Sequence, residues 1–221
     1  MSKGGKKYIV VGIDEAGRGP LAGPLAVGAV ATKISLNASK IKFWKFLIPK
    51  ISASRKFCAP TPRISKIYFL RNIKDSKKLS AKKREEWREI LRKNFDCQSV
   101  LIGPKIIDKI GISKAAKMAV AKILRKFNLP VGGPDLVLLD GSLFAPKHYN
   151  QKTIIKGDEK VPLIAAASII AKTTRDAKML RLHKKFPQYC FDRHKGYGTK
   201  LHYKMLKKYG FCPFHRYSFC K

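Results

Sequence analysis

The segment YIVVGIDEAGRGPLAGPLAVGAVAT, residues 8–32, decides the fold. Its first part, Tyr8 to Ile13, is a continuous apolar run, and Pro24 to Thr32 is a second run rich in Val and Ala. Short apolar runs bounded by glycine and proline are typical of buried strands joined by a turn. We therefore predict two strands that pair closely, with the Gly-Arg-Gly-Pro sequence at 17–20 as the turn between them.

Downstream of this pair, predicted helices and strands alternate, which indicates an α/β fold. The pattern predicts a mixed central sheet of about five strands flanked by helices, with a small C-terminal helical extension. The predicted helices run from an N-cap at Ser80 to about Asn94, from a cap at Ser113 to about Phe127, from Pro162 toward Leu182, and from about Thr199 to Tyr209. The further strands are expected at Ser99 to Ile102, Leu136 to Leu139 and Lys152 to Lys156.

The charge of the chain indicates a polyanionic partner. Lys and Arg number 48 against 14 Asp and Glu, for a formal net charge of +34 over 221 residues. Residues 33–74 alone carry eleven Lys or Arg and no acidic residue. Such an excess is typical of nucleic-acid-binding proteins, although a Lys-rich source proteome is the alternative explanation.

The cysteines and the hydropathy pattern indicate a compartment. Five cysteines, an odd number, are scattered without a Cys-x-x-Cys pair, which argues against a disulfide framework and favours a reducing cytoplasm. The apolar run at 8–13 is too short for a signal peptide, and no stretch approaches membrane-spanning length. We expect a cytoplasmic protein that makes no use of a membrane.

Four acidic residues follow predicted strands in a chain that is poor in acids. Asp14 and Glu15 follow the first strand, Asp140 follows Leu136 to Leu139, and Asp158 comes shortly after the strand that ends near Lys156. Ligands of open α/β sheets gather at strand ends, so these carboxylates are predicted to converge. Converging carboxylates with hard oxygen donors favour Mg²⁺ or Mn²⁺, and two such ions catalyse phosphodiester hydrolysis. The alternative is that each acid is an ordinary turn or cap residue.

Strand alternation sends the side chains of Asp14 and Glu15 to opposite faces, so both reach one site only if the backbone bends just after them. Gly17 and Gly19 permit that bend and allow close approach of a ligand to the main chain, while Arg18 adds a positive charge. The turn is therefore a candidate binding loop for phosphate or sugar oxygens.

At this point several motifs are similar to a known family. Asp14-Glu15-Ala16-Gly17-Arg18-Gly19-Pro20, followed by Gly23-Pro24, resembles the opening motif of ribonuclease HII. Further blocks follow in the order of that family: residues 75–80, 139–141, 156–158 with Val161-Pro162, 166–176, 194–199 and 215–219. Apart from about residues 33–73, the resemblance covers nearly the whole chain.

The resemblance implies a ribonuclease H-like fold and an endoribonuclease. It implies hydrolysis of the RNA strand of RNA/DNA hybrids and cleavage 5′ of ribonucleotides embedded in duplex DNA, leaving a 5′-phosphate and a 3′-hydroxyl. Two Mn²⁺ or Mg²⁺ ions would be held by the catalytic residues Asp14, Glu15, Asp140 and Asp158. Gly17, Arg18 and Gly19 would recognise the 2′-hydroxyl, the one group that marks RNA, and the adjoining backbone. Tyr197 would pack against the sugar at the RNA–DNA junction, and Ser76 and Lys77 would hold phosphates of the duplex.

The domain organisation follows from the same blocks. We predict a catalytic domain over residues 1–187, interrupted by a basic insertion at about 33–73, and a substrate-binding extension over 188–221 packed on it. The protein is expected to act as a monomer on RNA/DNA hybrids and on DNA containing ribonucleotides.

Two rival functions and one rival residue stay open. A non-catalytic nucleic-acid-binding protein would also explain the charge, and a resolvase or integrase relative would share the carboxylates but cut DNA. Asp176 is a rival for the fourth metal ligand; we predict instead that it pairs with Arg175, Lys178 or Arg181 on the same helix.

Overall fold

The computed structural model describes residues 6–36, 70, 73, 79–127 and 133–220, and its centre is one five-stranded sheet. The strands are β1 (Lys6–Ala16), β2 (Leu25–Leu36), β3 (Asp96–Ile102), β4 (Leu136–Asp140) and β5 (Gln151–Ile154). Their order across the sheet is β3-β2-β1-β4-β5. β1 pairs antiparallel with β2, as does β2 with β3, whereas β1, β4 and β5 run parallel. This confirms the predicted mixed sheet.

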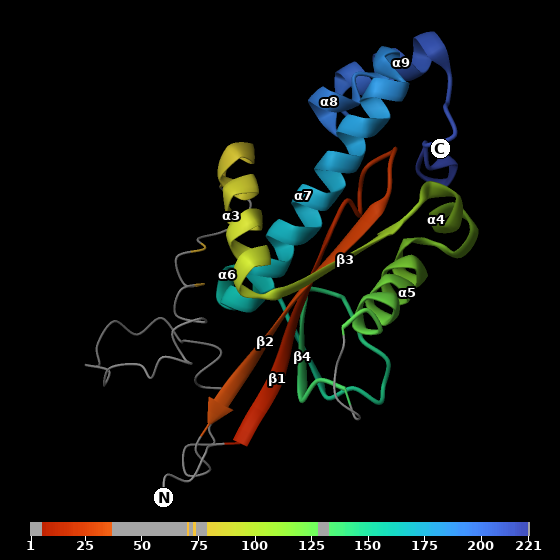
Figure 1. Cartoon of the computed structure of the whole chain (residues 1–221). Helices are drawn as coiled ribbons and strands as arrows, with labels where there is room; N and C mark the ends of the chain where they lie inside the picture. The colour runs from red at the N-terminus through yellow and green to blue at the C-terminus, as the bar shows by residue number, and fades with distance from the viewer. Residues whose placement is uncertain (1–5, 37–69, 71–72, 74–78, 128–132, 221) are drawn as a thin grey trace, which may run out of the picture.

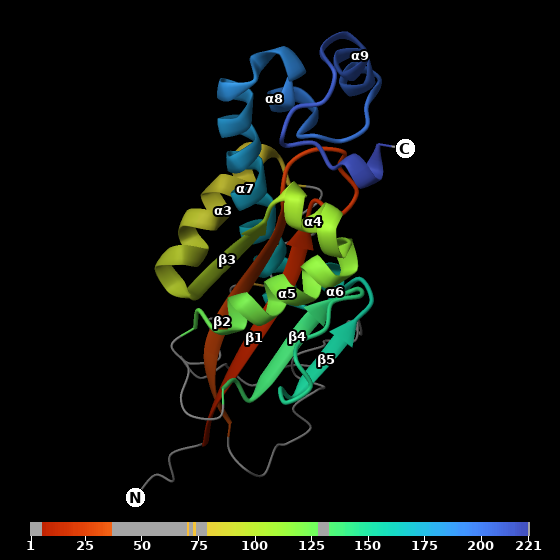
Figure 2. The same cartoon turned by 90° about the vertical axis from the view of Figure 1, so that its right-hand side faces the viewer.

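Helices cover both faces of the sheet (Figures 1 and 2). One face carries α3 (Ala81–Asn94) and the long α7 (Pro162–Lys185), and the other carries α4 (Pro104–Ile110) and α5 (Ile112–Leu124). The alternation of side chains along β1 divides the core between these layers, because Val10 packs with α7 while Val11 and Ile13 pack with α5. The sheet is therefore buried on both sides, which explains the nearly continuous apolar sequence of its central strands.

Two glycines allow α7 to lie directly against the sheet. A Cβ added at Gly12 of β1 would lie 2.5 Å from the Leu163 carbonyl oxygen, and one added at Gly28 of β2 would lie 2.4 Å from the Ala167 carbonyl oxygen. Neither distance leaves room for a side chain. The run Ala165 to Ala167 on the facing helix is small for the same reason, and this close packing sets the position of α7 relative to the end of β1.

The C-terminal segments pack around the far end of α7 (Figure 1). They comprise the 3-10 turn η2 (Pro187–Tyr189), α8 (Phe191–His194), α9 (Lys200–Tyr209) and a second 3-10 turn, η3 (Tyr217–Phe219). A small core of Met179, Tyr189, Phe191 and Cys212 joins them to Ala22 from the β1–β2 connection. None of the described helices has both the length and the apolar character needed to cross a membrane. The domain boundary at 187 stays a prediction.

Most predicted elements are found, with bounds that differ by a few residues. Ser80 caps α3 by accepting a hydrogen bond from the Lys83 amide, and Pro162 opens α7 as predicted. The predicted cap at Ser113 is wrong, because α5 begins after Gly111, whose φ of 79° ends a short helix, α4, that the sequence analysis missed. The strand predicted to reach Lys156 ends at Ile154, since Lys156 adopts a left-handed conformation and opens α6 (Gly157–Lys160). Most of the predicted basic insertion, residues 37–69, lies outside the described residues.

Candidate active site

A pocket of about 490 Å³ opens at the carboxyl ends of β1 and β4. Its walls come from five parts of the chain: the end of β1 with the following loop, the end of β4, α7, α3, and the segment before α9. The lining residues are Asp14, Glu15, Ala16, Gly17, Arg18, Gly19, Arg84, Asp140, Ser168, Lys172 and Tyr197. The pocket therefore contains seven of the ten predicted site residues, and Asp158, Ser76 and Lys77 are not among them.

The parallel pairing of β1 with β4 brings two of the predicted carboxylates together. Ile13 is opposite Leu139 in the register, so Asp14 and Asp140 are the next residues on adjacent strands. β1 continues to Ala16, so Asp14 is inside the strand and not at its end. The Gly157 amide donates a 2.6 Å hydrogen bond to Asp140 Oδ1, which fixes α6 and its Asp158 beside the same strand end. Asp158 is buried, with 2% of its surface exposed.

The electrostatics of Asp14 show how close these acids are. Burial, and then the charge of Asp140, raise the pKa of Asp14 to about 8. Hydrogen bonds from the Glu15 amide, at 2.6 Å, and from the Ser168 hydroxyl act in the opposite direction, and Asp158 adds a smaller upward contribution. Because like charges in a buried site repel, the Asp14 carboxylate needs a nearby cation in order to ionise at neutral pH.

The donor atoms fit hard divalent cations, although they do not form a closed ligand set. Glu15 Oε2 is buried without a hydrogen bond from any described residue, while its Oε1 accepts from Arg18 Nη1 at 2.7 Å. No group of three or more His, Cys, Asp or Glu side chains within the described ranges is arranged to hold one ion. The carboxylates are thus close enough to repel one another but are not gathered around a single point, and their role as metal ligands stays a prediction.

The loop after β1 has the bend that the sequence predicts. Gly17 has a φ of 89°, a conformation that favours glycine, and the main chain turns there toward the pocket. Arg18 reaches back over the loop to Glu15 and also donates to Ser113 Oγ at 3.2 Å. Ser113, which does not cap α5, therefore contacts the predicted recognition loop. Gly19 is exposed at the mouth of the pocket.

Tyr197 also lines the pocket, and its backbone is held in place by two histidines, His202 and His215. Its ring is 42% exposed, with Lys172 Nζ at 5.9 Å from the ring centroid. Its carbonyl lies 3.0 Å from His202 Nδ1, which must therefore carry a proton and donate. His202 Nε2 then accepts from His215 Nε2 at 3.1 Å, and His215 Nδ1 accepts from the Cys212 amide at 2.9 Å. These hydrogen bonds between neutral histidine rings hold the backbone of Tyr197 against α9 and the segment at Cys212 to His215.

The neutral state of His202 predicts a pH-dependent stability. Burial, followed by the charge of His194, lowers the pKa of His202 to about 4, below its ordinary value of 6.5. The unfolded chain therefore binds more protons between these values, so the stabilisation is present above pH 6.5 and is lost as the pH falls toward 4. We expect a loss of about 3 kcal/mol from this group, since each pKa unit corresponds to ~1.4 kcal/mol.

Thermal unfolding at pH 7 and at pH 4.5 measures this effect. His202→Gln should reduce the difference in unfolding temperature between the two pH values, whereas His148→Gln, a change at an exposed histidine, should leave it unchanged. An equal pH dependence in wild type and His202→Gln would contradict the assignment.

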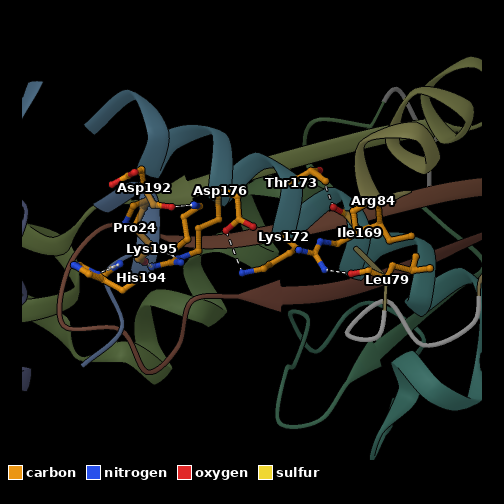
Figure 3. A network of polar contacts seen from close by, with 12 residues as sticks. Pro24, Leu79, Arg84, Ile169, Lys172, Thr173, Asp176, Asp192, His194 and Lys195 are labelled. Atoms are coloured by element: carbon orange, nitrogen blue, oxygen red, sulfur yellow. Dashed lines mark hydrogen bonds and ion pairs between the residues drawn. The ribbon is translucent and has the colours of Figure 1, made fainter. Parts of the chain in front are cut away.

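Three polar pocket residues were missed by the sequence analysis, and one ion pair was wrongly assigned. Arg84, Ser168 and Lys172 line the pocket, and Figure 3 shows Arg84 of α3 with Lys172 of α7. The spacing of Ser168 and Lys172, one helical turn apart, is the signal that could have identified them together. Lys172 Nζ lies 3.1 Å from Asp176 Oδ1, so Asp176 pairs with this lysine rather than with the predicted Arg175, Lys178 or Arg181. Ser76 and Lys77 lie outside the described residues.

Known proteins resemble this chain in both sequence and structure. The profile of the family described as ribonuclease HII matches residues 59–221. The ribonuclease HII of Endomicrobium trichonymphae is 41% identical over 214 residues, which covers 96% of this chain and 85% of that protein. In a complex of PCNA with ribonuclease HII from Archaeoglobus fulgidus, a chain superposes with a TM-score of 0.68 at 27% identity, covering 95% of this chain and 94% of that one.

A more distant structure agrees in fold alone. The Bst ribonuclease HIII solved in complex with Mn²⁺ superposes with a TM-score of 0.59 at 15% identity, covering 92% of this chain and 63% of that one. The matched structures confirm the predicted ribonuclease H-like fold. With its five-stranded mixed sheet, its acidic pocket and a relative of 41% identity, the chain belongs to the ribonuclease HII family and is a hydrolytic nuclease of the ribonuclease H type.

Proposed function

We propose that the protein hydrolyses the RNA strand of RNA/DNA hybrids and cuts 5′ of ribonucleotides embedded in duplex DNA by two-metal-ion catalysis, leaving a 5′-phosphate and a 3′-hydroxyl. The observation that carries this proposal is the pocket that combines Asp14, Glu15 and Asp140 with the loop at Gly17–Gly19. Membership of the ribonuclease HII family supports an endoribonuclease that acts on RNA/DNA hybrids. The preference for ribonucleotides within DNA rests on the resemblance of the loop and of Tyr197 to that family.

The residues proposed to hold the metal are Asp14, Glu15, Asp140 and Asp158. The crowding that raises the pKa of Asp14, and the buried Glu15 Oε2 without a hydrogen bond, support a cation between them. Two divalent ions, Mn²⁺ or Mg²⁺, would supply an activated water and stabilise the leaving oxygen. The Mn²⁺ complex of the Bst ribonuclease HIII, a protein of the same fold, is consistent with this choice.

The other pocket residues have complementary roles in the proposal. The Ser168 hydroxyl orients Asp14 through a hydrogen bond. The main chain of Gly17 to Gly19 would approach the ribose and its 2′-hydroxyl, because glycine leaves the backbone uncovered there. Lys172 and Arg84 add positive charge beside the acidic centre, where a phosphate of the cleaved strand would lie.

Activity assays on three labelled duplexes test the function. An RNA/DNA hybrid, a DNA duplex with one ribonucleotide and an all-DNA duplex would each be incubated with Mg²⁺, Mn²⁺ or a chelator. We expect cleavage of the first two only, dependent on metal, with products carrying a 5′-phosphate. Cleavage of all-DNA duplex would instead favour a DNA-cutting relative, and binding without any metal-dependent cleavage would favour a non-catalytic protein.

Tyr197 is predicted to matter most for single ribonucleotides. An isolated ribonucleotide offers only one 2′-hydroxyl and one RNA–DNA junction, so its recognition depends on each contact, and the flat exposed ring of Tyr197 is proposed to pack on that sugar. Tyr197→Ala is expected to lower kcat/KM about 30-fold on the single-ribonucleotide duplex and about threefold on a long hybrid, as for the loss of a stacking contact.

Steady-state kinetics on both duplexes would measure this selectivity. The matched control is Tyr217→Ala, because Tyr217 is 57% exposed but is not part of the pocket. Equal losses on the two substrates would remove the junction role of Tyr197.

The proposed state is a cytoplasmic monomer. The four cysteines within the described ranges, Cys97, Cys190, Cys212 and Cys220, are free thiols, which suits a reducing compartment. Light scattering of the purified protein tests the oligomeric state, and a mass of twice 24.9 kDa would contradict the proposal.

A further inference from the structure

Two arginines that have no role in the proposed cleavage reaction are completely buried against the loop of residues 17–24. Arg175 on α7 and Arg216 just before η3 both have 0% of their surface exposed. Together they donate six hydrogen bonds, and every acceptor is a main-chain carbonyl. Arg175 donates to Pro24 at 3.0 Å, Ala22 at 3.3 Å and Lys195 at 2.9 Å, and Arg216 donates to Gly23 at 3.0 Å, Arg18 at 3.0 Å and Gly17 at 2.7 Å.

Burying two arginine side chains in this way is energetically unfavourable by itself. The hydrogen bonds of these guanidinium groups all go to neutral carbonyls. The charges of Asp176 near Arg175 and of Asp108 near Arg216 offset only part of the cost of burial, because burial still lowers the pKa of each arginine. Burial, and then repulsion from Arg175, lower the pKa of Arg216 to about 10, so the two cations are also close enough to oppose each other. Their hydrogen bonds stabilise the conformation of one loop, residues 17–24, because five of the six acceptor carbonyls belong to it.

Arg175 also contacts the other half of the proposed recognition site. Its guanidinium carbon lies 5.4 Å from the centroid of the Tyr197 ring, and it holds the Lys195 carbonyl two residues before that tyrosine. On the loop side, a Cβ added at Gly17 would lie 2.0 Å from Arg175 Nε. Figure 3 shows Pro24 and Lys195, which both accept from Arg175, next to α7.

We propose that Arg175 and Arg216 are positioning residues for ribonucleotide recognition, and that Arg175 fixes the place of Tyr197 relative to the loop at Gly17–Gly19. The proposal rests on the function proposed above. All three hydrogen bonds of the Arg216 side chain go to the loop and none goes to the segment that carries Tyr197, so its effect should fall on the loop more than on the spacing between the loop and Tyr197. The two arginines therefore predict different patterns of substrate loss.

The geometry requires arginine and not merely a positive charge. Arg175 binds three carbonyls on two separate segments, and Arg216 binds three carbonyls on one, which uses the planar fork of the guanidinium group. A lysine at either position has a single nitrogen and cannot reach three acceptors in these directions. Arg→Lys changes therefore keep the charge and remove the positioning.

A double-mutant cycle with Tyr197→Ala tests the proposal on the single-ribonucleotide duplex. Arg175→Lys is expected to lower kcat/KM about 20-fold on that duplex and about threefold on a long hybrid, and to add less than about twofold further loss to Tyr197→Ala, because both changes disturb one contact. Arg216→Lys is expected to lower kcat/KM to a similar degree on both substrates and to multiply fully with Tyr197→Ala.

The outcomes separate this inference from the proposed function. If the wild-type protein does not cut the single-ribonucleotide duplex, the proposed function fails. If wild type cuts it but Arg175→Lys and Tyr197→Ala multiply fully, or Arg175→Lys affects both substrates equally, the positioning role of Arg175 is overturned. Multiplication of Arg216→Lys with Tyr197→Ala supports the division of roles, and strong coupling between them overturns it.

Unfolding temperatures of all variants show whether each one folds. If Arg175→Lys does not fold, the cycle is repeated with Arg175→Gln, whose planar amide keeps two N–H donors on a shorter side chain. Coupling of Arg175→Gln with Tyr197→Ala supports the proposal, and independence of the two changes overturns it.

Discussion

Replacing Asp14 with Asn is expected to lower kcat on an RNA/DNA hybrid by about 10³-fold or more while the dissociation constant of the hybrid changes by less than about twofold. Asp14 is 4% exposed at the centre of the carboxylates, and its side chain is too deeply placed to contribute much to duplex binding. Asn keeps the shape and the hydrogen bond from the Glu15 amide but not the negative charge. Single-turnover cleavage and a binding titration measure the two quantities separately.

The same substitution should stabilise the metal-free protein by an amount that depends on pH. The folded pKa of Asp14, about 8, is above its ordinary value of 3.8. Between these values the unfolded chain releases a proton that the folded protein keeps, so the stability of the wild type falls as the pH rises from 4 to 8. Asp14→Asn should therefore unfold about 5 °C or more higher than wild type at pH 8 in chelator, and at a similar temperature at pH 4.

The control for both measurements is Glu89→Gln, at an exposed acid on α3 outside the pocket. It should change neither cleavage nor the pH dependence of unfolding. Near-normal turnover by Asp14→Asn would remove the proposed metal site, and a lower unfolding temperature of this variant at pH 8 would contradict the crowding of the carboxylates.

Replacing Gly28 with Ala should strongly destabilise the protein, because the added methyl group has no room. The new Cβ would lie 2.4 Å from the Ala167 carbonyl oxygen and 2.5 Å from the Ala171 amide nitrogen, both in the backbone of α7. Neither atom belongs to a flexible side chain, so α7 must move away from the sheet. We expect a loss of about 3 kcal/mol in the free energy of unfolding.

Activity should fall together with stability in this variant. Gly28 is opposite Asp14 in the β1–β2 register, and α7 carries Ser168 and Lys172, so a shift of this helix moves one side of the pocket relative to the carboxylates. Denaturant unfolding and hybrid cleavage measure the two losses. Gly103→Ala is the matched control, because a Cβ at Gly103 would contact nothing within 4 Å. If Gly28→Ala is as stable as Gly103→Ala, the close packing of α7 does not constrain the site.

The sequence was sufficient to predict the sheet and the acidic centre because both depend on local patterns. Apolar runs identify strands, and acids near the ends of parallel strands meet at one edge whatever the loops do. The position of Asp14 inside β1, two residues before the strand ends, could not be predicted, because the length of a strand is set by its pairing with β2. The helix α4 was missed for a similar reason: its seven residues are stabilised by packing on the sheet more than by their own pattern.

The supporting residues of the site depend on contacts between distant segments, which spacing does not reveal. Arg84 and Lys172 enter the pocket from helices that are far apart in sequence. Arg175 and Arg216 have the composition of surface residues in a basic chain, and nothing local indicates that both are fully buried. The partner of Asp176 is a different case, because Lys172 lies one turn earlier on the same helix, at an i,i+4 spacing that the sequence contains.

The bonds from Arg216 to the loop at 17–23 have a consequence for biosynthesis. A ribosome makes the N-terminal strands first, but the loop between them keeps three of its carbonyls unpaired until the chain has been extended by almost two hundred further residues. The nuclease should therefore acquire its activity only after Arg216 has been synthesised. A nascent chain arrested at residue 210 is expected to be cut by protease within the 17–24 loop, and protection of that loop in the arrested chain would show that it matures earlier.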